Sequence, residues 1–193
     1  MSLQEWELSG KGNERVGGII LAILFAFVLA ACSAQPTPVP SDVEMIHSAV
    51  SAAHDSLSRD AATITLNSKG QVEVVRQGTN GWSCLFDWPT SGASLCVDKN
   101  GLEWLQAWVT HKIPPTRKIG FGFTVTGGLG HCGTALFLDG PSKDHDRMHG
   151  GPHILVFGFR ISRNPYPATN DSPTTSCVMW PHTPYAHLMI PFE

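Results

Sequence analysis

Histidine is the side chain that most often carries chemistry near neutral pH, and the sequence holds nine of them. Five lie between His145 and His187. Within that stretch, His149 and His153 flank a Gly-Gly-Pro segment, whereas His187 belongs to an expected final strand. We expect these two regions to meet at one end of a sheet and to form the candidate site there.

Metal binding is one hypothesis for this site. Met148, Met179 or Met189 would place soft thioether ligands beside neutral imidazoles, a combination that suits copper in an oxidising compartment. Copper is therefore the candidate cofactor of this hypothesis, although the residues alone leave the cofactor unknown.

A structural role is the interpretation that we favour for the same histidines. Buried His153 and His187 would bond to backbone groups and hold the loops around Trp180 and Tyr185 in place. Both interpretations concern one set of candidate ligand or metal-site residues. The set is His149, His153, His187, Met189, Trp180 and Tyr185.

A ligand-binding or accessory domain is the function that we favour from the sequence. Aromatic side chains are common at binding surfaces, and several of them would line a groove for a partner or a small ligand. The groove residues would be Trp82, Trp88, Trp104, Trp180 and Tyr185.

An enzyme is the third hypothesis. A hydrolase would use His153 or His187 as general base beside Asp98 or Asp146. The sequence has no G-x-S-x-G, S-x-x-K or H-E-x-x-H motif, so no catalytic residue is assigned and enzymatic activity stays undecided.

The N-terminal region carries an export signal. Residues 19–31 are uncharged, too short to cross a bilayer as an ordinary helix and of the right length for the core of a signal peptide. They end in Leu-Ala-Ala-Cys, which resembles the lipobox of bacterial lipoproteins and predicts cleavage before Cys32 and lipidation of its thiol. The alternative is an uncleaved anchor, because the leader is long and carries three glutamates.

This reading divides the chain into three parts. Residues 1–31 form the signal peptide or anchor, residues 32–40 a proline-rich tether, and residues 41–193 a single extracytoplasmic domain.

We expect a location in the bacterial cell envelope, facing the periplasm or the exterior. The expected partners are the membrane, through the lipid at Cys32 or an N-terminal helix, and an envelope protein. A net charge of −3 without basic clusters argues against nucleic acid.

Four cysteines remain once Cys32 is assigned to lipid, and an even number favours disulfides in an oxidising compartment. Three pairings are possible. Cys84 and Cys96 close a short loop rich in turn-forming residues, which leaves Cys132 and Cys177 as the second pair. Metal-binding thiolates would need closely spaced pairs, and the sequence has none.

The periodicity of apolar residues predicts an α+β fold. Expected helices span residues 41–60, where Ser41 and Glu44 form a capping box, and residues 102–111. Residues 62–66 and 71–76 alternate as a hairpin, and further strands are expected at 119–126, 154–159 and 186–190. We therefore expect an antiparallel sheet of about five strands, with two helices on one face and disulfides that stabilise the domain.

Several motifs resemble those of an uncharacterised family of bacterial exported proteins. They are N-G-W-S-C at residues 80–84, C-V-D at 96–98, G-P-H at 151–153, V-M-W at 178–180 and T-P-Y-A-H-L-M-I-P at 183–191. The resemblance runs from about Arg59 to the end and implies a domain type without implying a reaction. Cys132, Cys177, Pro181 and His182 depart from the family pattern, which supports a private second disulfide and sets His182 outside any shared site.

Overall fold

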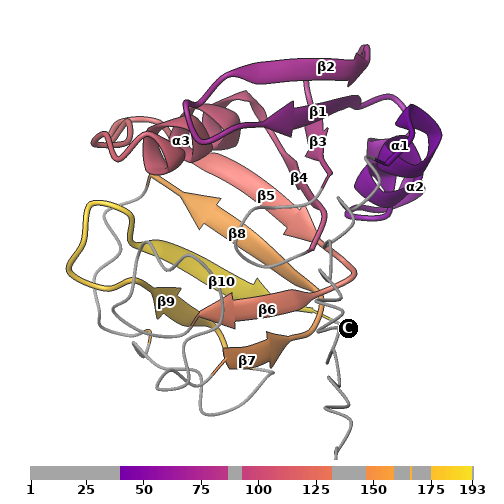
Figure 1. Ribbon diagram of the computed structural model, residues 1–193. Helices are drawn as coiled ribbons and strands as arrows, with labels where there is room; N and C mark the ends of the chain where they lie inside the picture. Colours follow the sequence, from indigo (N-terminus) through magenta and orange to yellow (C-terminus); the bar gives the residue numbers. More distant parts are fainter. Residues whose placement is uncertain (1–39, 87–92, 132–146, 159–165, 167–174, 193) are drawn as a thin grey trace, which may run out of the picture. The chain divides into compact units, whose positions relative to one another are not determined.

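The computed structural model describes residues 40–86, 93–131, 147–158, 166 and 175–192, with the backbone alone at 128–131 and 147–150. All of these residues belong to one compact unit, which begins at Val39 (Figure 1). The predicted signal peptide, Cys32 and most of the tether lie outside the described residues.

Three helices and ten strands make up this part of the chain. The helices are α1 (Asp42–Val50), α2 (Asp55–Ser58) and α3 (Lys99–Val109). The strands are β1 (Ala62–Leu66), β2 (Val72–Arg76), β3 (Ser83–Leu85), β4 (Leu95–Val97), β5 (Gly120–Thr124), β6 (Gly128–His131), β7 (Arg147–Gly150), β8 (His153–Phe157), β9 (Cys177–Met179) and β10 (His187–Pro191).

The α+β class is confirmed, but the prediction of a five-stranded antiparallel sheet was wrong. Eight strands form one sheet in the order β2-β1-β3-β4-β5-β8-β10-β9 (Figure 1). The sheet is mixed because β3 pairs with β1 in parallel, while its other pairs are antiparallel. The added strands β3, β4 and β9 have three residues each, too few for an alternating pattern to be recognised in the sequence.

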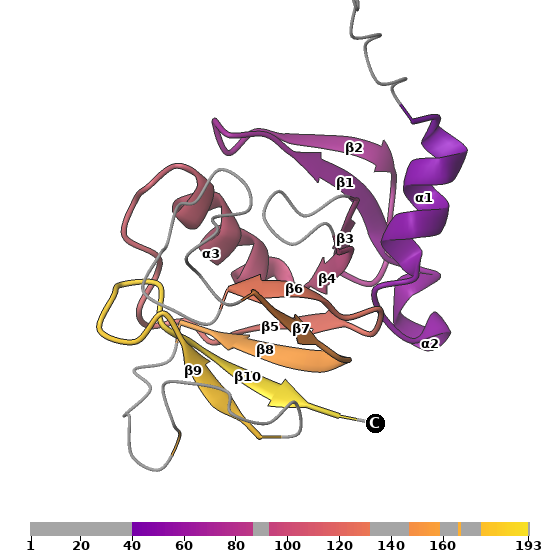
Figure 2. The same cartoon turned by 60° about the horizontal axis from the view of Figure 1, so that its bottom comes forward.

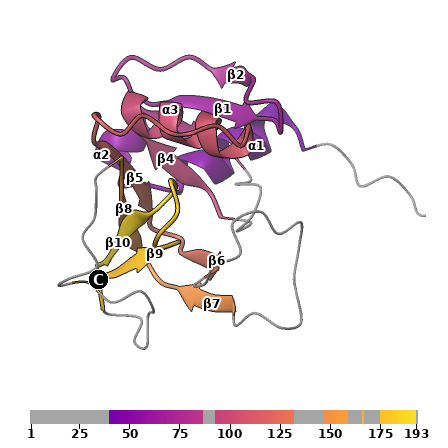
Figure 3. The same ribbon diagram turned by 90° about the vertical axis from the view of Figure 1, so that its left-hand side faces the viewer.

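The strands β6 and β7 pair with each other in a separate two-stranded sheet. They occupy the connection between β5 and β8. Figure 3 shows this hairpin set apart from α3.

The predicted helix at residues 41–60 is two helices. Its capping box is present, because Ser41 and Glu44 exchange side-chain and backbone hydrogen bonds. Between the two helices, the Ala52 carbonyl accepts a hydrogen bond from the Val125 nitrogen, 2.9 Å away and one residue beyond β5. This bond attaches the segment that joins the helices to the end of β5.

The helices cover both faces of the large sheet, which corrects the expectation that they share one. α1 contacts β1, β2, β3 and β4, whereas α3 contacts β4, β5 and β8. Figure 2 shows α1 and α3 on opposite sides of the strands. We call the face under α3 the inner face and the other the outer face.

The inner face holds the main core. Trp104 and Trp108 of α3 pack onto apolar side chains that the strand register places on one side of the sheet. The central members from β1 to β10 are Ile64, Leu85, Leu95, Val97, Leu155, Phe157 and Met189.

A close contact between two glycines sets the distance from α3 to β5. The first turn of α3 contains Gly101, whose nitrogen donates to the N-cap Asp98 at 2.7 Å. A Cβ at Gly101 would lie 2.9 Å from the Phe121 carbonyl oxygen, and a Cβ at Gly120 would overlap the backbone of Gly101. The helix can therefore reach the sheet only because both positions lack a side chain.

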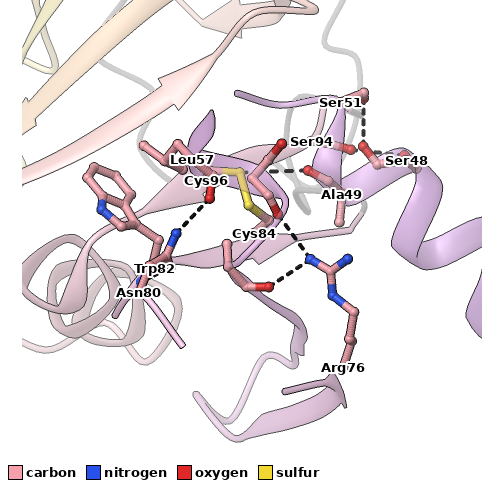
Figure 4. Close-up of a disulfide and its surroundings, with 12 residues drawn as sticks. Ser48, Ala49, Ser51, Leu57, Arg76, Asn80, Trp82, Cys84, Ser94 and Cys96 are labelled. Carbon is pink, nitrogen blue, oxygen red and sulfur yellow. Dashed lines mark hydrogen bonds between the residues drawn. A yellow bond between two sulfur atoms is a disulfide. The ribbon is translucent and has the colours of Figure 1, made fainter. Parts of the chain in front are cut away.

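The outer face near β1, β3 and β4 is covered by α1 and by a disulfide (Figure 4). Cys84 and Cys96 lie directly opposite each other on β3 and β4 and are bonded, which confirms this pairing. Small alanines, including Ala49, pack over the bridge, and Ser48 bonds Ser94 at 2.9 Å. The predicted Cys132–Cys177 bond stays a prediction because Cys132 lies outside the described residues.

We expect Gly120→Ala to destabilise the domain by more than about 2 kcal/mol, because the new methyl group meets backbone that cannot rotate away. Urea denaturation monitored by tryptophan fluorescence measures the change. Gly151→Ala is the matched control, since a Cβ there has no atom within 4 Å. Equal stability of the two variants would show that α3 does not depend on this close approach.

Candidate functional site

His187 lies at the start of β10 on the inner face and is 2% exposed. Its ring is enclosed by three aromatic rings. The centroids of Trp180, Trp104 and Phe157 lie 5.1, 5.3 and 5.5 Å from the centroid of His187. Both tryptophans meet the imidazole nearly edge-on, a favourable geometry for aromatic pairs.

A hydrogen bond fixes the tautomer of His187, and burial keeps its ring neutral. Its Nδ1 lies 3.0 Å from the Tyr185 carbonyl oxygen, which can only accept, so Nδ1 carries the hydrogen and Nε2 keeps the lone pair. Burial lowers the pKa of His187 to about 4, and the bond to Tyr185 opposes this effect. Repulsion between the two rings when His153 is also protonated lowers the pKa further. The imidazole is therefore neutral at physiological pH.

His153 has the same arrangement at the start of β8. Its Nδ1 donates to the Gly151 carbonyl oxygen at 2.7 Å, and the side chain is 8% exposed. Burial lowers the pKa of His153 despite this hydrogen bond. Both histidines are thus buried, neutral and bonded to backbone, which is how histidines that fix local structure are usually held.

The sheet register separates the two histidines. His153 lies opposite Pro191, which is four residues beyond His187 on β10. At about 3.3 Å per residue, the two positions are about 13 Å apart along the strands. Both lie on the inner face, but they belong to opposite ends of the β8–β10 pair.

The turn between β9 and β10 is held by Thr183. Its Oγ1 donates to the Trp180 carbonyl at 2.8 Å and accepts from the Tyr185 nitrogen at 3.1 Å. Trp180 has a φ of 50° and His182 a φ of 65°, conformations that are unfavourable for bulky residues. A bulky residue keeps a positive φ only where the surrounding structure restrains it. Here the buried side chain of Trp180 provides that restraint.

The other candidate residues occupy different surroundings. Met189 is buried on the inner face, opposite Leu155 on β8 and Cys177 on β9. His149 lies on β7 opposite Leu129, and its side chain is outside the described part of the structure.

Three of the five residues predicted to line an aromatic groove lie instead in a buried aromatic cluster. Trp104, Trp180 and Tyr185 are 2, 5 and 6% exposed, and burial raises the pKa of Tyr185. Trp82 is half-buried, with its ring 5.5 Å from that of Phe123. Trp88 lies outside the described residues.

Asp98, one of the two acids proposed to assist a catalytic histidine, has a structural role. The Asp98 side chain caps α3, where it accepts from the Gly101 nitrogen. Asp146, the alternative, is outside the described residues. Among the residues that the structure describes, no three His, Cys, Asp or Glu side chains gather closely enough to hold a metal ion.

The outer face of β5, β8 and β10 carries apolar side chains at each position that the register places there. Phe121 lies opposite Val156, and Phe123 opposite Ile154. On the far side of β8, Leu188 and Ile190 continue the two rows. We call this surface the outer strip, and its members are Ile119, Phe121, Phe123, Ile154, Val156, Leu188, Ile190 and Phe192.

Part of the outer strip is accessible. Ile119 is 46% exposed, Phe121 43% and Phe192 37%. Sequence reasoning missed this surface, although one signal was present. Residues 154–157 are apolar at consecutive positions, which indicates a strand with two apolar faces.

Comparison with known proteins found no matching family model, no matching curated protein and no matching solved structure. The resemblance to exported bacterial proteins therefore stays a prediction. Within the described ranges, no helix has both the length and the apolar character required to span a membrane.

We expect the free energy of unfolding to fall by about 2 kcal/mol between pH 7 and pH 5. The pKa of His187 is lower in the folded than in the unfolded protein, so its contribution is complete above pH 6.5 and is lost as the pH falls. His153 acts in the same direction. Urea denaturation at both pH values measures the change.

The variant His187→Phe is the comparison for this prediction. It removes the main titrating group while keeping an aromatic ring in the cluster, so its stability should depend less on pH. An equal loss in the variant, or no loss in the unchanged protein, would contradict the assignment of a buried neutral His187.

Proposed function

We propose that this chain is an envelope lipoprotein, anchored at Cys32, whose domain is an interaction module that binds a partner protein through the outer strip. The observation that carries the proposal is an uncharged apolar surface of which three members are more than one-third exposed. Exposed, contiguous apolar patches on soluble domains commonly mark interaction sites.

The composition of the strip favours a protein as its partner. Its eight side chains are aliphatic or aromatic and carry no charge to attract nucleic acid or anionic lipid. The whole chain is mildly acidic, with a net charge of −3. A protein with an apolar surface, held in the same envelope, is the occupant that matches these properties.

A photoreactive phenylalanine analogue at position 121 tests this proposal in growing cells. We expect a single envelope protein to be crosslinked through the analogue at position 121, because Phe121 belongs to the strip and is 43% exposed. The crosslink should disappear when Ile119→Lys is introduced, since a charge on the strip opposes apolar contact. Mass spectrometry identifies the partner.

The matched control places the same analogue at Glu73, an exposed position on β2. A product at position 73 as strong as that at position 121 would contradict the proposal. So would the absence of any protein product at position 121. Crosslinking to a second copy of the chain alone would overturn the assignment to a different envelope protein.

An extracytoplasmic location is supported by the disulfide. Cys84 and Cys96 are bonded within the core under α1, and such bonds form and persist mainly outside the reducing cytosol. The predicted tether would hold the domain away from the bilayer while leaving the strip free to bind.

We expect the mature protein, purified from a membrane fraction, to begin at a diacylglyceryl-modified Cys32. Intact-mass measurement checks this, because loss of residues 1–31 and gain of lipid change the mass in opposite and calculable ways. The Cys32→Ala variant should keep the leader. A species that retains residues 1–31 in the unchanged protein would contradict lipoprotein processing and favour the uncleaved anchor.

A further inference from the structure

We propose that the inner face of β9 and β10 binds one monovalent copper ion through Nε2 of His187 and the thioether sulfurs of Met179 and Met189. This inference is independent of the proposed partner, which binds the opposite face of the sheet.

The strand register brings the three side chains together. His187 lies directly opposite Met179, and both are on the inner face. Opposed residues have Cβ atoms about 4.5–5.5 Å apart. Met189 is two residues beyond His187 on the same strand and face, about 7 Å away. An ion above these two strands is within reach of all three side chains, because methionine has three rotatable bonds.

The imidazole is already arranged as a ligand. Metal-binding histidines usually donate one ring N–H to a carbonyl or carboxylate, which fixes the other nitrogen as the ligand. In His187, Nδ1 donates to the Tyr185 carbonyl at 3.0 Å, so Nε2 holds the lone pair.

The chemistry of the set selects the metal. Thioether and imidazole ligands are soft or intermediate and prefer Cu(I), whereas Mg²⁺ and Ca²⁺ need oxygen. His187, Met179 and Met189 are 2, 7 and 7% exposed, so a bound ion is shielded from water. Cys177 lies opposite Met189, but the proposal does not use its thiol, which the sequence assigns to a disulfide.

A route for the ion is provided by the position of β9. This strand is only three residues long and forms one end of the large sheet. Its three residues are buried, so the ion enters only when β9 opens locally, a motion that would expose Met179 and then its partner His187.

The test uses the full mature protein and Cu(I) in competition with the chelator bathocuproine disulfonate. We expect one Cu(I) to bind per chain and to quench tryptophan fluorescence, because the rings of Trp104 and Trp180 lie 5.3 and 5.1 Å from that of His187. The double variant Met179→Leu/Met189→Leu should bind at least 100-fold more weakly.

Leucine has nearly the volume of methionine, so the double variant should fold, and its circular dichroism melting curve verifies this. Met45→Leu on the half-buried side of α1 is the control and should bind Cu(I) like the unchanged protein. The proposal is overturned if the folded unchanged protein takes up no Cu(I). It is equally overturned if the folded double variant binds as tightly as the control.

Discussion

A sheet with apolar side chains on both faces must be covered on both, and this constraint shapes the whole domain. The inner face is covered by α3, whose tryptophans reach from β4 to β8. On the outer face, α1 contacts β1, β2, β3 and β4. Beyond α1, Leu188 is buried, but Ile119, Phe121 and Phe192 stay more than one-third exposed. This incomplete cover is what connects the fold to the proposed interaction.

The helices α3 and α1 pack on the two faces of the sheet in different ways. On the inner face, Gly101 and Gly120 allow backbone to approach backbone, so the large ring of Trp104 can extend across β5 to Phe157. On the outer face, small alanines such as Ala49 fit over the Cys84–Cys96 bridge. Burial of His187 under Trp104 follows from the first arrangement and keeps the imidazole neutral.

Local patterns predicted local structure well. The capping box at Ser41, the hairpin of β1 and β2, helix α3 and the Cys84–Cys96 bond were all expected from short-range signals. The parallel pairing of β1 with β3 and the three-residue strands depend on contacts distant in sequence, for which no local pattern exists.

In the candidate site, too, the residue types could be predicted from the sequence, but their arrangement depends on contacts distant in sequence. His153 and His187 were identified by residue type, but their separation by four positions is set by the register of β8 with β10. Trp104 and Trp180 do not line the expected aromatic groove, because they are buried and tryptophan is as suitable for a core as for a surface. The members of the outer strip come from segments distant in the sequence. They can be identified as neighbours only once the pairing of β5, β8 and β10 is known.

The central claim is that the outer strip is covered by a partner in the envelope and open in the isolated protein. Labelling of a Phe121→Cys variant with a membrane-impermeant maleimide tests it directly, with Glu73→Cys as reference and the unchanged protein as background. The account predicts that position 121 reacts in purified protein but is protected in intact envelopes, while position 73 reacts in both. Equal labelling of position 121 in the two preparations would contradict it.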